Sequence, residues 1–122
     1  MGTRSLEFTI STEVYCVAKL PAETRASDKY LSVVRDEELT VVAAEPFDFP
    51  TAFIERGWKA VKIVGPLDFS EVGIMAEISG LLAGAGISVF GISTFSTDYF
   101  LVKLDRLAEA IRTLESAGHR LG

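Results

Sequence analysis

The chain has 122 residues, of which 48% are hydrophobic, and its 12 basic and 17 acidic residues give a formal net charge of −5. This length fits one ordinary domain or two very small ones, and the apolar content is sufficient for a packed core. Because the balance is acidic and no long basic run interrupts it, nucleic acid and anionic membranes are poor candidates as partners.

Cys16 is the single cysteine and His119 the single histidine. An intrachain disulfide, a cysteine-rich metal site and any site that needs two histidines are therefore excluded. We predict that Cys16 is a buried, inert thiol, that His119 has a dipole or solvent role after a helix, and that the protein uses no cofactor or metal. The N-terminus lacks the apolar segment of a signal peptide, so we expect a cytoplasmic protein.

The first third of the chain consists of short apolar runs that lack helical periodicity. These runs predict strands at 13–20, 30–35 and 39–44, the last two joined as a hairpin through Asp36, Glu37 and Glu38. Residues 21–28 are small and polar, which is typical of a loop.

Two prolines, Pro46 and Pro50, mark the expected joint between two halves of the chain. Residues 51–56 can form one or two helical turns that end at Gly57. The joint from Pro46 to Gly57 is too apolar for a free linker, so we expect four of its side chains to pack between the halves: Phe47, Phe49, Phe53 and Ile54.

From Trp58 onward the pattern predicts alternating strands and helices. The expected elements are a strand at 58–65, a helix at 69–84, strands at 86–94 and 98–104, a helix at 105–117 and a short final strand. This order indicates an α+β fold of the ferredoxin-like type, an antiparallel sheet with both helices on one face. The first half then extends the sheet or forms a degenerate copy of the second.

Each predicted helix carries one apolar stripe and terminal signals. Asp68 and Glu71 have capping-box spacing before the first helix, and Asp105 is a candidate N-cap for the second. Glycines end both helices, at 84–86 and at Gly118. The stripes are Ile74, Ile78, Leu81 and Leu82 in the first helix, and Leu107, Ile111 and Leu114 in the second.

Two polar segments predict a small ligand site. The first helical turn, from Phe69 to Gly73, offers unpaired N–H groups to an anion, and Gly73 either admits a ligand or lets a neighbouring element pack closely. Asp98 either accepts a cationic group or bonds its own backbone in a turn. Together the two walls suit a zwitterion such as a free amino acid. No nucleophile has an identifiable base, so catalysis has no positive support.

The second half resembles an ACT domain, a small ligand-binding regulatory module. The resemblance is carried by Gly65-Pro66-Leu67-Asp68-Phe69-Ser70, Gly73, residues 82–88 and Ile92-Ser93-Thr94-Phe95-Ser96-Thr97-Asp98-Tyr99. The second half resembles in particular the tandem modules of short bacterial proteins, of the CASTOR arginine sensors and of aspartokinase regulatory domains. By this resemblance residues 57–122 are an ACT domain and residues 1–56 a degenerate, strand-rich ACT-like half.

The resemblance implies a non-enzymatic regulatory protein that binds an amino acid where a strand turns into a helix. Asp98 would hold the cationic group of the ligand, and the nearby acidic residues favour a basic amino acid. We also expect a homodimer and a regulated partner protein; the alternative is a structural interaction module with a vestigial pocket. The implied ligand-binding residues are Leu67, Asp68, Phe69, Ser70, Val72, Gly73, Ile74, Thr94, Phe95 and Asp98.

Overall fold

The computed structural model describes residues 5–48, 51–64 and 73–122. The chain divides into two compact units, a helical unit made of Met1–Thr12 with Lys59–Gly122 and a strand unit made of Glu13–Trp58. Strand β5 (Ile54–Ile63) contributes its first residues to the strand unit and its last residues to the helical unit. Within the described residues no helix is long and apolar enough to cross a membrane.

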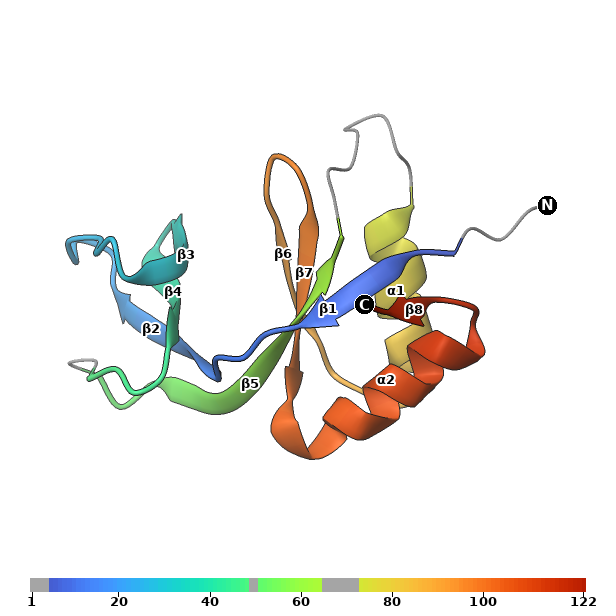
Figure 1. The fold of residues 1–122 in the computed structure, drawn as a ribbon. Coiled ribbons are helices and arrows are strands. Elements are labelled where there is room, and N and C mark those ends of the chain that lie inside the picture. Colours follow the sequence, from blue (N-terminus) through green and yellow to red (C-terminus); the bar gives the residue numbers. More distant parts are fainter. Residues whose placement is uncertain (1–4, 49–50, 65–72) are drawn as a thin grey trace. The chain divides into compact units, whose positions relative to one another are not determined.

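The described residues of the helical unit form five strand segments and two α-helices. Its sheet has the order β6-β7-β5-β1-β8, where β1 is Glu7–Ile10, β6 is Phe90–Ser93, β7 is Asp98–Lys103 and β8 is Arg120–Leu121. Helices α1 (Ile74–Gly84) and α2 (Leu107–Ser116) lie on the same side of this sheet (Figure 1). The predicted ferredoxin-like α+β arrangement is therefore confirmed.

Strand β1 is an element that the sequence pattern did not predict. It pairs antiparallel with β5, Phe8 opposite Ile63, and parallel with β8, Phe8 opposite Leu121. The sheet is therefore mixed, and the short final strand exists but lies beside β1. The division of the chain into two ACT-like halves at residues 56 and 57 stays a prediction.

The core of the helical unit lies between the helices and the sheet. From α1 it receives Ile78 and Leu82, from α2 Ala110 and Leu114, and from the strands Phe8 and Phe100 among others. Leu81, Leu107 and Ile111 are half-buried against it. The predicted stripes are confirmed because one face of each amphipathic helix meets the sheet.

The helix boundaries differ from the predicted ones at the N-terminal ends. Helix α1 begins at Ile74 with Gly73 as its N-cap, in a left-handed conformation with φ 86°. The predicted capping pair, Asp68 and Glu71, lies outside the described residues. Asp105 is not an N-cap, because it lies inside the 3₁₀ turn η1 (Leu104–Arg106) and α2 follows Arg106.

Both helices end as predicted, at a glycine with positive φ. In α1 the N–H groups of Gly86 and Ile87 donate to the carbonyls of Ala83 and Leu82, and Gly86 has φ 76°. In α2 Gly118 has the same role with φ 97°. These paired bonds satisfy the last carbonyls of each helix, and the backbone conformation favours glycine because other residues enter it at a cost.

In the strand unit, the described residues form four antiparallel strands in the order β3-β4-β2-β5. Strands β2 (Tyr15–Pro21), β3 (Tyr30–Arg35) and β4 (Glu38–Ala44) confirm the three predicted runs. The β3–β4 hairpin is closed by Asp36, whose N–H donates to the Glu38 carbonyl and whose Oδ1 accepts from Glu38 N–H. The buried core of this unit comprises Cys16, Ala18, Leu20, Leu39, Val41 and Ala43.

The predicted helical turns at 51–56 are wrong. The segment enters β5 at Ile54, which lies opposite Ala18 of β2, so cross-strand pairing replaces a weak local helix signal. Phe47 and Ile54 pack against the core of the strand unit itself. Phe53 is 64% exposed with Lys19 Nζ 4.3 Å from its ring centroid, so it does not pack as predicted, and Phe49 lies outside the described residues.

Candidate functional site

The turn between β6 and β7 is organised by Thr94. Its backbone N–H donates to the Thr97 carbonyl at 2.8 Å, and its Oγ1 lies 2.9 Å from the same carbonyl oxygen and 3.1 Å from Thr97 N. Ser96 N–H also donates to Thr94 Oγ1 at 3.4 Å. Thr94 is one of the predicted ligand-binding residues, and its hydroxyl is engaged in holding the turn from Thr94 to Thr97.

Thr97 anchors this turn to the sheet. Its side chain is buried, and its Oγ1 donates to the backbone carbonyl of Ile63 at the end of β5. Beside this anchor, Lys62 of β5 places its Nζ 5.7 Å from the ring centroid of Tyr99 on β7. Thr97 was not predicted to have a role, although a polar residue between two strand runs is a signal for such an anchor.

Asp98 opens β7 and lies directly opposite Ser93, the last residue of β6. Ser93 Oγ donates to Asp98 Oδ1 at 2.8 Å, and the aspartate is half-buried. This side-chain bond crosses the strand pair, whereas the alternative turn role requires a bond to the residue's own backbone. A carboxylate held in this way is oriented to accept a further bond from a cation.

Phe95 stands at the tip of the hairpin with 79% of its surface exposed. An aromatic ring so exposed is costly to leave in water, and burial of a phenylalanine side chain contributes about 1.5–3 kcal/mol. The hairpin therefore carries an oriented carboxylate and an exposed ring within four residues. That combination offers charge and apolar contact area to a small ligand.

The other predicted wall runs from Leu67 to Ile74, and the structure describes only its last two residues, Gly73 and Ile74. Leu67, Asp68, Phe69, Ser70 and Val72 lie outside the described residues. Gly73 is exposed at the start of α1, where its carbonyl accepts from Glu77 N–H at 2.7 Å.

Ile74, the first residue of α1, is 4% exposed and belongs to the core of the helical unit. Its backbone, which lies in the first helical turn, is thus the part suited to ligand contact. That the two walls face one another stays a prediction.

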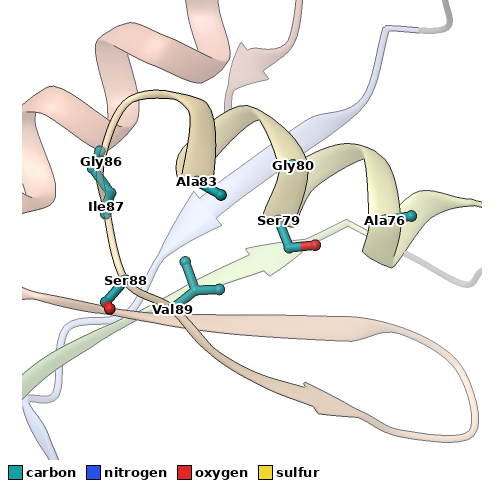
Figure 2. A pocket seen from close by; sticks show the side chains of 8 residues that line it. All are labelled: Ala76, Ser79, Gly80, Ala83, Gly86, Ile87, Ser88 and Val89. Atoms are coloured by element: carbon teal, nitrogen blue, oxygen red, sulfur yellow. The ribbon is translucent and has the colours of Figure 1, made fainter.

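A groove that was not predicted from the sequence runs along α1 (Figure 2). It has a volume of about 600 Å³ and is lined by Ala76, Ser79, Gly80 and Ala83 of the helix and by residues 86–89. A Cβ on Gly80 would meet no atom within 4 Å, so packing inside the chain does not require glycine there. Small residues at positions 76, 80 and 83 were the available signal, since they share one helix face.

The model of the ACT domain family matches residues 53–116. The chain belongs to the ACT domain family. This match begins with β5 and includes α1, the β6–β7 hairpin and all of α2, so it contains the groove and the Ser93–Asp98 pair.

The relatives include mammalian proteins named cytosolic arginine sensor for mTORC1 subunit 1. The protein from Bos taurus is 38% identical over 94 residues, which is 76% of this chain and 28% of the relative. The protein from Homo sapiens is 39% identical over 87 residues, which is 70% of this chain and 26% of the relative. The chain thus spans little more than a quarter of the length of these relatives.

Solved structures match nearly the whole chain. A protein from Agrobacterium tumefaciens has a TM-score of 0.88 and 28% identity, with 98% of this chain and 94% of that chain covered. The regulatory subunit of aspartate kinase from Thermus thermophilus has a TM-score of 0.65 and 11% identity, with 90% and 95% covered. The second likeness supports the fold alone.

Proposed function

We propose that the chain is a non-enzymatic regulatory module of the ACT type that binds a free amino acid with a cationic side chain. The family membership and the arginine sensors among the relatives support the ligand class. The observation that carries the proposal is the oriented carboxylate of Asp98 on the β6–β7 hairpin. We further propose that the module acts in the cytoplasm on a partner protein, whose activity changes when the amino acid binds.

The chemistry of Asp98 favours a guanidinium or ammonium group. Its Oδ1 is occupied by the Ser93 hydroxyl, and within the described part of the chain no residue is bonded to its Oδ2. A charge-assisted bond from a cation to this oxygen is stronger than a bond between neutral groups. The exposed ring of Phe95 provides apolar contact for the aliphatic stem of such a ligand.

Isothermal titration of the purified protein with arginine, lysine and neutral amino acids tests the proposal. We expect arginine or lysine to bind and Asp98→Asn to weaken that binding about tenfold or more. The matched control is Asp105→Asn, which removes the same charge from an exposed residue of η1 in the same unit. The absence of binding by any amino acid at millimolar concentration would remove the ligand claim.

We also propose that the module is a homodimer that uses the groove along α1. Strand β6, which continues from the groove-lining residues 86–89, pairs only with β7 among the described strands, so its outer edge is open to another strand. Gly80 would allow close approach of a second backbone.

Gly80→Leu should raise the dimer dissociation constant about tenfold, whereas Ala108→Leu on the exposed part of α2 should not. Analytical ultracentrifugation distinguishes the two. An unchanged dimer in Gly80→Leu would exclude this face. Dimer loss in this variant without amino-acid binding by the parent protein would favour the alternative of a structural interaction module.

A further inference from the structure

His119 is buried, which contradicts the solvent role that the sequence offers as an alternative to a dipole role. It follows the glycine that ends α2, yet it is only 3% exposed. Its ring lies among three separate elements: the segment before β1, helix α1 and the start of β8. The predicted solvent role is wrong because the chain turns at Gly118 and the next residues return to pair with β1, Arg120 opposite Glu7.

The two ring nitrogens of His119 have different partners. Nδ1 accepts a hydrogen bond from the backbone N–H of Leu6 at 3.0 Å. Nε2 lies 3.0 Å from Glu77 Oε2 on α1, although the angles there are not those of a hydrogen bond. A nitrogen that accepts an N–H bond carries no proton, so the ring proton of the neutral imidazole is assigned to Nε2, facing the carboxylate.

Protonation of this ring therefore has opposite effects on its two sides. A proton taken from the solvent must be placed on Nδ1, which then points a donor at the Leu6 N–H donor, and the bond between them is lost. On the other side the imidazolium gains an attraction to the Glu77 carboxylate. One proton thus exchanges a bond to the N-terminal segment for an ion pair with α1.

Among residues 5–48, 51–64 and 73–122, the other charged groups near the ring do not oppose this exchange. Glu7 and Arg120 pair across β1 and β8 at 3.9 Å, and because strand side chains alternate they point to the face opposite Leu6 and His119. Glu115 in the last turn of α2 is exposed. Among the described residues, Glu77 is the charged group in contact with the imidazole.

We propose that His119 is a pH-operated link between the N-terminal segment and helix α1. In its neutral form the ring holds Leu6 in place beside β8, where Ser5 Oγ also donates to the Gly118 carbonyl at 2.6 Å. On acidification the ring releases the Leu6 amide and pairs with Glu77. The link connects the segment before β1 to the first turn of α1, where Glu77 N–H donates to the carbonyl of the N-cap residue Gly73. It operates whether or not an amino acid binds.

NMR spectroscopy of the ¹⁵N-labelled protein from about pH 8 to about pH 5 tests this link. We expect the ring nitrogens at the basic end to show the proton on Nε2. As the ring takes up its second proton, the Leu6 amide should lose about tenfold in protection against hydrogen exchange. The Val64 amide, which donates to the Glu7 carbonyl at 2.9 Å on the other edge of β1, should keep its protection and is the internal reference.

Glu77→Gln keeps the shape of the side chain and removes the carboxylate that pairs with the imidazolium, so at about pH 5 the Leu6 amide should keep more of its protection than in the parent protein. Glu115→Gln is the matched control on α2 and should leave the Leu6 protection as in the parent. A proton on Nδ1 at about pH 8 would overturn the link. So would Leu6 protection that is the same at the two ends of the pH range, or an equal loss in the parent and in Glu77→Gln.

Discussion

Ser93 Oγ donates a 2.8 Å hydrogen bond to Asp98 Oδ1 and closes the end of the β6–β7 strand pair. Since the two residues are also direct register partners, the backbone and the side chains fix the carboxylate together. The bond lies at an exposed position, so its contribution to folding is small. Its larger effect is expected in ligand binding, where an aspartate held in one orientation loses less entropy when it accepts a cation.

Ser93→Ala should therefore weaken the proposed amino-acid binding about two- to fivefold while leaving stability nearly unchanged. Ser96→Ala is the control, because it removes a hydroxyl from the exposed tip of the same hairpin and leaves the Ser93–Asp98 bond in place. Isothermal titration with arginine and urea unfolding measure the two quantities. Equal affinity in Ser93→Ala and the parent protein would separate the hydroxyl from binding.

Two neighbouring glycines at the end of α1 should respond in opposite directions to alanine. Gly84 is the last helical residue and a Cβ added there would meet no atom within 4 Å, so Gly84→Ala should raise the free energy of unfolding by up to about 1 kcal/mol. Gly86 has φ 76°, so Gly86→Ala should lower it by about 1–2 kcal/mol. Urea denaturation of both variants checks this, and a shift in the same direction for both would contradict it.

The elements of the helical unit could be predicted because their signals are local. The stripe of α1 and the glycine after each helix are visible within a dozen residues of sequence, and the structure confirms them. Strand β1 and the first part of β5 were not predictable in this way. Their strand conformation depends on partners far along the chain, such as Ile63 for Phe8 and Ala18 for Ile54.

The candidate site was predictable to the same limited extent. The polar run after β6 identified Thr94 and Asp98, but the Ser93–Asp98 bond depends on strand register, which one sequence does not reveal. The burial of His119 was likewise hidden, because it follows from the parallel pairing of β1 with β8. Gly80 can be read from the sequence as a glycine inside a helical pattern. The groove beside it depends on the position of residues 86–89, which the sequence does not give.

Arg106 should stabilise the end of α1 from outside the helix. Its Nη1 donates to the Gly86 carbonyl at 3.1 Å and its Nη2 to the Ala85 carbonyl at 3.3 Å, while Glu109 Oε1 lies 2.7 Å from Nη2. Because the Arg106 side chain is over a third exposed, Arg106→Gln should lower the free energy of unfolding by only about 0.5–1 kcal/mol.

Arg112→Gln, on the exposed part of α2, is the control for the loss of one charge. Arg106→Lys should fall between the parent protein and Arg106→Gln, because lysine keeps the charge but lacks the planar fork. Thermal and urea unfolding report the order of the variants. Equal stability of Arg106→Gln and Arg112→Gln would show that the contacts with the α1 terminus contribute nothing.

Cys16 should make folding less favourable at alkaline pH. Its side chain is fully buried and its Sγ donates to the Ala43 carbonyl at 3.4 Å. Burial, with a smaller contribution from the Glu45 charge, raises the pKa of the thiol above its ordinary value of 9.0. The folded state therefore favours the neutral thiol, and this stabilisation is fully present below the unfolded-state pKa and is lost as the pH rises through the folded-state pKa.

Comparison with Cys16→Ala isolates this effect, since tyrosine and lysine titrations are common to both proteins and the cavity cost is independent of pH. We expect the stability difference between parent and variant to be constant from about pH 7 to about pH 8 and to shrink above about pH 9, by at most about 1.4 kcal/mol per pH unit. Urea unfolding in the presence of a reductant measures it. Parallel stability profiles for the two proteins across the alkaline range would show that the thiol ionises as readily in the folded core of the strand unit as in the unfolded chain.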